Sequence, residues 1–138
     1  MHTLRSFVTA VTLLLVVAAC ARAVAGGDVA PGAALQVQQS GAVLLDVRTP
    51  EEFAGGHAAG AQLVPWLYGG GRPNPEFVEA VGKLAPPDQP LVVICQSGSR
   101  SAQAAARLRG AGYQAVYNVA GGSVAWRQAQ LPWVAAGR

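Results

Sequence analysis

The sequence predicts a single α/β domain with a largely parallel central sheet. Short apolar runs bounded by turn-forming residues alternate with stretches that carry helix-start and helix-stop signals. Behind an apolar leader, a little over a hundred of the 138 residues remain, which is enough for one compact domain. In folds of this kind ligands bind beyond the carboxyl ends of the strands, so functional residues are expected where strands end.

An exported precursor is predicted by residues 1–25, which have the composition of a signal peptide. A short basic segment, 1–5, precedes an unbroken run of apolar residues and threonines, 7–19. This run is too short to span a bilayer comfortably, because spanning takes roughly 20 apolar residues. The mature domain is therefore expected to comprise residues 26–138 and to be periplasmic.

Two processing sites are open at the end of this leader. Residues 23–25 form an A-x-A site, whose cleavage would leave a soluble protein that begins at Gly26. Residues 17–20 resemble the lipobox of bacterial lipoproteins, whose use would leave a lipid on Cys20 and a lipid-anchored protein. The lipobox has valine where leucine is commonest, so the soluble form is the preferred interpretation.

Export leaves Cys95 as the only thiol of the mature chain, because Cys20 is either removed or lipidated. A single cysteine in an oxidising compartment excludes an intramolecular disulfide framework and indicates a reactive thiol or an intermolecular bridge. Loss of Arg5 and Arg22 with the leader leaves eight basic residues against seven acidic ones. A chain so nearly neutral has no basic patch for nucleic acid, and no membrane association is expected unless Cys20 is lipidated.

The first predicted strand is the short apolar run 43–45, which suits a strand buried on both faces. A helix is expected soon after it, because Thr49 suits the N-cap and Pro50 the first helical position. Glu52 stands where the reciprocal partner of a capping box belongs. The glycine pair 55–56 should stop this short helix.

The middle of the chain predicts another strand and two further strand–helix steps. Residues 61–64 predict a strand that Pro65 ends, and a Gly/Pro-rich loop then leads to a helix over about 76–84. Residues 91–94 are the most apolar strand, and an Ala-rich helix over 99–109 follows it.

The last part of the domain is predicted to be one more strand and one more helix. Gly112 supplies a helix stop before the strand 115–119. The glycine pair 121–122 then predicts a tight turn, with Ser123 as the N-cap of the final helix.

The chemistry is concentrated between Cys95 and Arg100. Cys95 leaves the most apolar strand and faces the amide groups of the following turn and helix, which stabilise an anion. Gly98 permits a left-handed backbone conformation, and Arg100 adds a permanent positive charge. These groups are expected to lower the pKa of the thiol, which makes Cys95 the predicted catalytic nucleophile. The predicted substrate-binding residues are Gln96, Ser97, Gly98, Ser99 and Arg100.

Asp46 and Arg48 end the neighbouring predicted strand and are interpreted as residues that support the loop. Arg100 has two roles open: contact with the substrate, or an ion pair with Asp46 that holds the loop. His57 is interpreted as structural. Because His57 and Cys95 are the only soft ligands of the mature chain, no metal site is predicted, and the chemistry requires no cofactor.

Three ordered motifs resemble the rhodanese family of sulfurtransferases, specifically its small single-domain members. LLDVRTPEEFAGGHAAGAQLVPW from Leu44 is similar to the family's D-V-R…E-[FY]…G-H-[IV]-x-G-A segment. VVICQSGSRSAQAAARLRGAGY from Val92 is similar to the active loop C-x-x-G-x-R and its helix. VYNVAGGSVAW from Val116 is similar to the closing L-x-G-G-x-x-x-W. Ala58 departs from the usual isoleucine or valine, which is expected to weaken packing rather than chemistry.

The resemblance implies a rhodanese-like fold, with a five-stranded parallel sheet flanked by helices, and a sulfurtransferase activity. Together with the leader, this predicts an exported sulfurtransferase. Cys95 would take sulfane sulfur from an anionic donor such as thiosulfate or polysulfide and hold it as a persulfide. A thiol or cyanide would then accept the sulfur, and a protein thiol is a further candidate acceptor.

Three alternatives stay open beside this activity. A non-enzymatic persulfide carrier or sensing module would share the same loop chemistry. Phosphatases and arsenate reductases of related fold separate their cysteine and arginine by five residues, whereas four separate Cys95 from Arg100, which makes a tighter cradle suited to one sulfur atom. An inert buried cysteine is the third alternative, because free cysteine is often buried.

Overall fold

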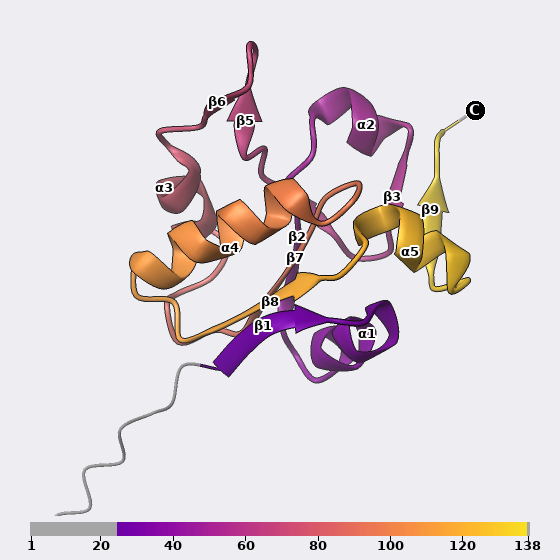
Figure 1. Ribbon diagram of the computed structural model, residues 1–138, viewed down its shortest axis with the longest axis horizontal. Coiled ribbons are helices and arrows are strands. Elements are labelled where there is room, and N and C mark those ends of the chain that lie inside the picture. The colour runs from indigo at the N-terminus through magenta and orange to yellow at the C-terminus, as the bar shows by residue number, and fades with distance from the viewer. Residues whose placement is uncertain (1–24, 138) are drawn as a thin grey trace, which may run out of the picture.

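Five parallel strands form the central sheet of the computed structural model, which describes residues 25–137 (Figure 1). The predicted α/β class and five-stranded parallel sheet are therefore confirmed. Residues 1–24, which include Cys20 and nearly all of the predicted leader, lie outside the described part. In spatial order, the strands are β1 (Ala25–Val29), β8 (Ala115–Val119), β7 (Leu91–Ile94), β2 (Val43–Asp46) and β4 (Gln62–Leu63).

Helices cover both faces of the sheet, and alternate residues of the strands divide the core into two clusters. Val93 of β7 lies in one cluster, against α3 and α4, whereas Val92 and Ile94 lie in the other, against α1 and α5. All four residues of β7 are buried, as its continuous apolar run predicts. The helices are α1 (Pro31–Gln39), α2 (Pro50–Ala54), α3 (Phe77–Gly82), α4 (Ser99–Gly110) and α5 (Gly122–Gln128).

Two small antiparallel pairs stand outside the main sheet. One joins β3 (Gly56–Ala58) to β9 (Trp133–Ala135), and this pair lies beside α2 and α5 in Figure 1. The other joins β5 (Leu67–Tyr68) to β6 (Arg72–Pro73) and projects above α3 in the same view. Both pairs border the carboxyl edge of the sheet, where the site is expected.

The predicted capping of α2 is confirmed, whereas that of α5 is wrong. The Thr49 hydroxyl accepts a hydrogen bond from the Glu52 N–H, and a Glu52 carboxylate oxygen accepts one from the Thr49 N–H. In α5 the N-cap is Gly121, not Ser123, because Gly121 and Gly122 are both left-handed, with φ of 74° and 59°, and the helix begins at Gly122. Ser123 is instead buried within the first turn.

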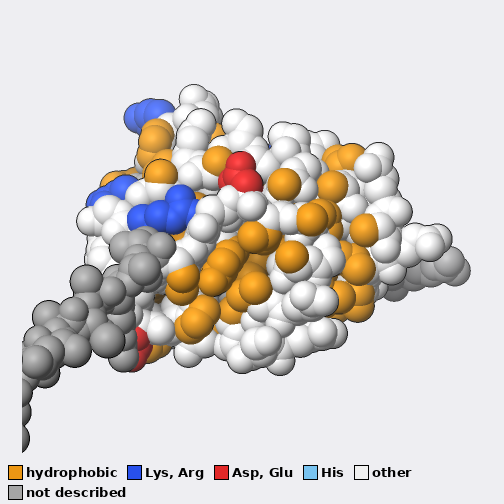
Figure 2. All heavy atoms as spheres, turned by 60° about the horizontal axis from the view of Figure 1, so that its bottom comes forward, with side chains coloured by type: hydrophobic (Ala, Val, Ile, Leu, Met, Phe, Trp, Pro, Cys, Tyr) orange, Lys and Arg blue, Asp and Glu red, His pale blue; other side chains and the backbone are white. Residues whose placement is uncertain are grey.

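The surface carries few charges. Figure 2 shows a face on which hydrophobic side chains gather and charged ones are sparse. A groove of about 400 Å³ lies beside α1. Within residues 25–137, no helix is both long and apolar enough to cross a membrane. Because apolar atoms make up much of any protein surface, this face alone does not indicate a partner.

Candidate functional site

Cys95 lies at the carboxyl edge of the sheet, immediately after β7. The neighbouring strand β2 ends at the same level, because Asp46 pairs in register with Ile94. Cys95 is only 1% exposed, and the following residues 96–98 form the turn into α4. The thiol is therefore held inside a loop at the edge where ligands of parallel sheets bind.

The sulfur of Cys95 caps the N-terminus of α4. The Gly98 N–H donates a hydrogen bond to Sγ at 3.1 Å, and the Ser101 hydroxyl donates another at 3.2 Å. The Ser101 N–H, in the first turn of α4, also stabilises Sγ, which thus takes the place of the side-chain oxygen of an N-cap residue. The loop closes in this way because Gly98 has a φ of 99°, which residues with a Cβ rarely adopt.

Opposing effects set the acidity of this thiol. Burial raises the pKa of Cys95, but the Ser101 hydroxyl and the N–H groups of Ser101, Gly98 and Ser97 stabilise the thiolate. The donors outweigh the burial, so the pKa lies below its ordinary value. A lowered pKa is the property that makes a cysteine nucleophilic at neutral pH.

The first turn of α5 turns the amide groups of the loop inward. The Ser123 N–H donates to the Cys95 carbonyl oxygen at 2.7 Å, and the Val124 N–H donates to that of Gln96 at 3.2 Å. In a trans peptide the N–H points opposite to the C=O, so the N–H groups of Gln96 and Ser97 face away from α5. The final helix therefore helps to set the direction of the donors around the sulfur.

Asn118 of β8 supports the same loop from the sheet. Its Nδ2 donates to the Gly98 carbonyl oxygen at 3.2 Å and to Oδ1 of Asp28 at 2.9 Å. Sequence reasoning missed Asn118, Ser101 and Asp28. The available signal was a polar residue near the end of an otherwise apolar strand, 115–119, which is unusual unless its amide has partners.

Arg100 is paired with Glu52, which corrects the expectation that Asp46 would be its partner. Nη1 and Nη2 of Arg100 donate to the two carboxylate oxygens of Glu52 at 2.7 and 2.9 Å. This hydrogen bonding to Arg100 lowers the pKa of Glu52 to about 2. Negative charge on Cys95 is among the causes that raise the pKa of Arg100, after its contact with Glu52, so the Arg100 cation and a Cys95 thiolate attract each other.

Asp46 and Arg48 form a buried ion pair with each other. Nη2 of Arg48 lies 2.7 Å from Oδ2 of Asp46 and also donates to the Gly56 carbonyl oxygen at 2.8 Å. The pair therefore ties the end of β2 to β3. Within residues 25–137 neither side chain hydrogen-bonds to the loop 96–100, so their support of that loop acts through the strand ends.

Within the described part of the chain, the side chains of Gln96, Ser97 and Ser99 form no hydrogen bond, whereas Nδ1 of His57 lies 3.2 Å from the Phe53 carbonyl oxygen. Gln96, Ser97 and Ser99 are exposed, and their contact with a substrate stays a prediction. The ring of His57 is stacked on Phe53, with centroids 3.8 Å apart, as befits a structural residue. Within residues 25–137 there is no group of three or more His, Cys, Asp or Glu side chains placed to hold a metal ion.

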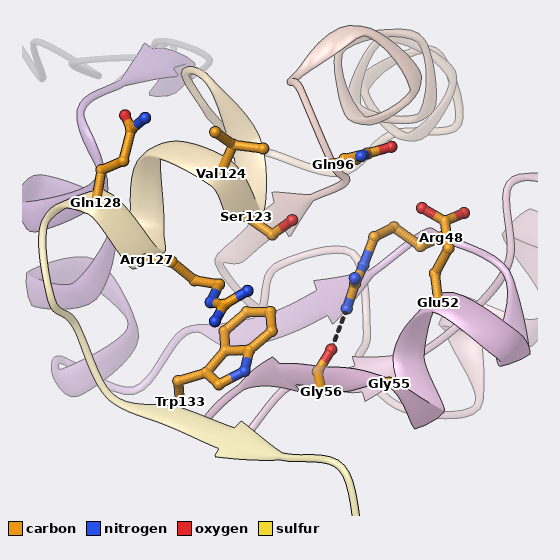
Figure 3. A pocket seen from close by; sticks show the side chains of 10 residues that line it. All are labelled: Arg48, Glu52, Gly55, Gly56, Gln96, Ser123, Val124, Arg127, Gln128 and Trp133. Atoms are coloured by element: carbon orange, nitrogen blue, oxygen red, sulfur yellow. Dashed lines mark hydrogen bonds between the residues drawn. The ribbon is translucent and has the colours of Figure 1, made fainter.

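Two cavities flank the loop. The first, which we name the Arg127 cavity, has a volume of about 430 Å³, and its lining is drawn in Figure 3. The second, the Tyr68 cavity, has a volume of about 540 Å³. Gln96 borders the first and Arg100 borders the second, so both lie next to the residues that follow Cys95. The Arg127 cavity is lined by Arg48, Glu52, Gly55, Gly56, Gln96, Ser123, Val124, Arg127, Gln128 and Trp133.

Comparison with known proteins agrees with this architecture. The sequence model described as Rhodanese-like domain matches residues 31–129. Thiosulfate sulfurtransferase 16, chloroplastic, of Arabidopsis thaliana is 44% identical over 91 residues, which are 64% of this chain and 76% of that protein. Thiosulfate sulfurtransferase 18 of the same plant is 43% identical over 99 residues, which are 68% of this chain and 73% of that protein.

A solved structure gives the same result for the fold. The crystal structure of Rv0390 from M. tuberculosis aligns with a TM-score of 0.68 at 29% sequence identity, and the alignment covers 80% of this chain and 97% of that one. The match of the family model spans well over half of the chain and includes Cys95, its loop and all of α5. The chain therefore belongs to the rhodanese-like family of sulfurtransferases.

Proposed function

We propose that this protein is an enzyme that moves sulfane sulfur from thiosulfate or polysulfide through a persulfide on Cys95 to a thiol or to cyanide. The observation that carries the proposal is the position of the Cys95 sulfur, which accepts hydrogen bonds from the Gly98 N–H and the Ser101 hydroxyl at the N-terminus of α4. Such a ring of donors stabilises a thiolate, and it suits a persulfide anion for the same reason.

In the first step, the Cys95 thiolate attacks the outer sulfur of thiosulfate. A new S–S bond forms, the S–S bond of the donor breaks, and sulfite leaves with the electron pair. No separate general base is needed, because the lowered pKa supplies the thiolate directly. The inward N–H groups of Gln96 and Ser97 favour the approach of this anionic donor.

In the second step, an acceptor thiolate or cyanide attacks the outer sulfur of the persulfide. The bond between the two sulfurs of the persulfide breaks, and the Cys95 thiolate is restored as the leaving group. The product is the persulfide of the acceptor, or thiocyanate when the acceptor is cyanide. The enzyme returns to its first state without a cofactor, and a protein thiol could serve as acceptor in the same way.

We also propose that the protein is exported to a periplasm. The basic start, the apolar run and the small residues of 1–25 support this location, and the soluble form beginning at Gly26 is favoured over lipidation of Cys20. The mass of the protein recovered from a periplasmic fraction tests the proposal. A mature N-terminus at Gly26 or a lipidated Cys20 would support export, whereas an intact Met1 in the cytoplasm would contradict it.

The activity is tested by steady-state turnover of the purified domain with thiosulfate and cyanide, by following sulfite and thiocyanate together. We expect equal amounts of both products from the wild type and none above background from Cys95→Ser. A single equivalent of sulfite without continued thiocyanate formation would favour the carrier or sensing module. No sulfite from the wild type would contradict thiosulfate as the donor, and polysulfide would then be tried in its place.

A further inference from the structure

The Arg127 cavity opens beside the loop that carries Cys95, and the transfer of one sulfur atom does not by itself require so large a space. Its volume of about 430 Å³ lies within the range of pockets that hold small organic ligands, about 300–1,000 Å³. Gln96 forms part of its wall, and the Cα atoms of consecutive residues are about 3.8 Å apart. A ligand held here lies beside the loop that carries the reacting sulfur, although Cys95 itself does not line the cavity.

Arg127 provides the uncommitted charge of this cavity. The other two charged residues of the wall are already held in ion pairs, Arg48 with Asp46 and Glu52 with Arg100, each at 2.7 Å. Within residues 25–137, Arg127 forms no ion pair. The net charge that the wall presents to a ligand is therefore positive.

The ring of Trp133 orients this charge. The Arg127 guanidinium lies 5.2 Å from the centroid of the ring, and that of Arg48 lies 5.8 Å from it. Figure 3 shows the Arg127 guanidinium, from α5, beside the ring, whereas the Arg48 guanidinium is directed to the Gly56 carbonyl oxygen. A stacked guanidinium is partly ordered before a ligand arrives, which reduces the entropy lost on binding.

The described wall of the Tyr68 cavity has no uncommitted positive charge. Its charged residues are Glu51 and Arg100, and the charge of Arg100 is already balanced by Glu52. A wall whose remaining charge is a carboxylate disfavours anions. An anionic ligand is therefore expected on the Arg127 side of the loop.

We propose that the Arg127 cavity is the subsite for the sulfur acceptor, and that it takes low-molecular-weight thiols that carry a carboxylate. The proposal rests on the proposed sulfurtransferase function. The carboxylate pairs with Arg127, the body of the acceptor lies against Trp133, and its thiolate attacks the outer sulfur of the Cys95 persulfide. The persulfide and the thiolate are both anions, so a cation that holds the far end of the acceptor offsets their repulsion.

Single-turnover transfer from the preformed Cys95 persulfide tests the subsite. The acceptors are matched pairs that differ in one terminal group: mercaptopropionate against mercaptopropanol, and mercaptohexanoate against mercaptohexanol. Decay of the persulfide is followed by intact mass. In at least one pair we expect the wild type to react faster with the acid than with the alcohol.

Variants at position 127 separate recognition of the carboxylate from the intrinsic reactivity of each thiol. We expect Arg127→Gln to reduce the preference for the acid by about threefold to fivefold, the size of an exposed ion pair, and Arg127→Glu to reverse it. Arg107→Gln removes the same charge from an exposed residue of α4 outside the cavity, and it should leave the preference unchanged.

The outcomes separate the two proposals. The subsite would be overturned if the wild type preferred neither acid over its alcohol, or if the preference survived both substitutions of Arg127. Transfer of sulfur to the thiols would still support the proposed function in that case. If neither thiosulfate nor polysulfide loads sulfur onto Cys95 in the wild type, the proposed function fails and the subsite fails with it.

Discussion

At the scale of single residues, the reactivity of Cys95 is a balance between burial and hydrogen bonding. Burial alone would raise the pKa of the thiol and leave an inert cysteine. The Ser101 hydroxyl and the neighbouring N–H groups reverse the direction of that shift. Ser101 therefore acts directly on the thiolate, although it lies in the first turn of α4 and not in the loop itself.

Substitution Ser101→Ala should make the thiol less acidic. The rate at which iodoacetamide alkylates Cys95 should increase with pH, because it follows the fraction of thiolate. In the wild type this increase should occur at a lower pH than for an ordinary thiol, and in the variant it should occur at a higher pH than in the wild type. We expect the pH of this increase to shift upward by about one unit, since a hydrogen bond to a charged group contributes roughly 1.5 kcal/mol.

Ser99→Ala is the matched control, because Ser99 is exposed and its hydroxyl makes no hydrogen bond to Sγ. Its pH profile should coincide with that of the wild type. Coincident profiles for Ser101→Ala and the wild type would contradict the assigned role.

At the scale of secondary-structure elements, the loop is held between α5 on one side and α2 on the other. The first turn of α5 binds the carbonyl oxygens of Cys95 and Gln96. On the other side, Glu52 of α2 holds Arg100 at the start of α4. Neither connection is local in sequence, and both fix the direction of groups that surround the sulfur.

Gly122→Ala tests the contact with α5. A Cβ on Gly122 would lie 2.5 Å from the Cys95 oxygen and from the carbonyl group of Gln96, and its φ of +59° strains any residue with a side chain. We expect unfolding free energy to fall by about 1–3 kcal/mol from the strained backbone. Sulfur transfer should fall by about 10- to 100-fold, because small displacements of reacting groups are costly.

Gly110→Ala provides the comparison for this substitution. Gly110 ends α4, and a Cβ there meets nothing within 4 Å. Its stability should be equal to that of the wild type or higher by about 0.5–1 kcal/mol. If Gly122→Ala retained full transfer activity, the first turn of α5 would have no part in orienting the loop.

Glu52→Gln tests the contact with α2 through pH. The pKa of Glu52 is lowered from 4.5 to about 2, so its contribution to stability is fully present above about pH 4.5 and is lost as the pH falls toward 2. Urea midpoints measured from pH 7 down to pH 3 should therefore decrease less in Glu52→Gln than in the wild type. Glu51→Gln, an exposed neighbour on the same helix, should follow the wild type, and equal slopes for all three proteins would contradict the assignment.

At the scale of the whole molecule, the sheet separates two apolar clusters while its carboxyl edge holds the site. Trp126 is fully buried in the cluster with α1, and its indole N–H donates to the Pro132 carbonyl oxygen at 3.0 Å. This contact places the chain that leads into β9, and so positions Trp133 in the wall of the Arg127 cavity. The core and the Arg127 cavity are thereby connected.

Trp126→Ala should destabilise the fold by about 3–5 kcal/mol, as expected for a large side chain removed from a core. The free energy of unfolding in urea measures this loss. Val124→Ala changes an exposed residue of the same helix, with 47% of its surface accessible, and should stay within about 0.5 kcal/mol of the wild type. A loss below 1 kcal/mol for Trp126→Ala would mean that α5 is only loosely packed.

The sequence predicts the central elements well because their apolar runs and caps are local signals. Strands 91–94 and 115–119 and the capping box at Thr49 all lie where they are expected. β1 was not predicted, because AGGDV contains a single β-branched residue, Val29, and no aromatic one, and it forms a strand by pairing with β8. α1 was not predicted either, although Pro31 stands at its start.

The site was predicted only where its residues are neighbours in the chain. Cys95 and the turn at Gly98 follow from one short stretch of sequence. The partners Glu52, Asn118 and Ser123 come from three other elements, and their contacts depend on strand order and register that no local pattern encodes. For that reason Glu52 was interpreted as a capping residue alone, and Arg100 was expected to pair with Asp46.

The central claim, that Cys95 carries sulfane sulfur, is tested most directly by the intact mass of the purified protein after exposure to thiosulfate. The wild type should gain the mass of one sulfur atom, and a thiol or cyanide should remove it. Cys95→Ser should gain nothing under the same conditions. An unchanged wild-type mass after both thiosulfate and polysulfide, or an equal gain in the Cys95→Ser variant, would contradict the account.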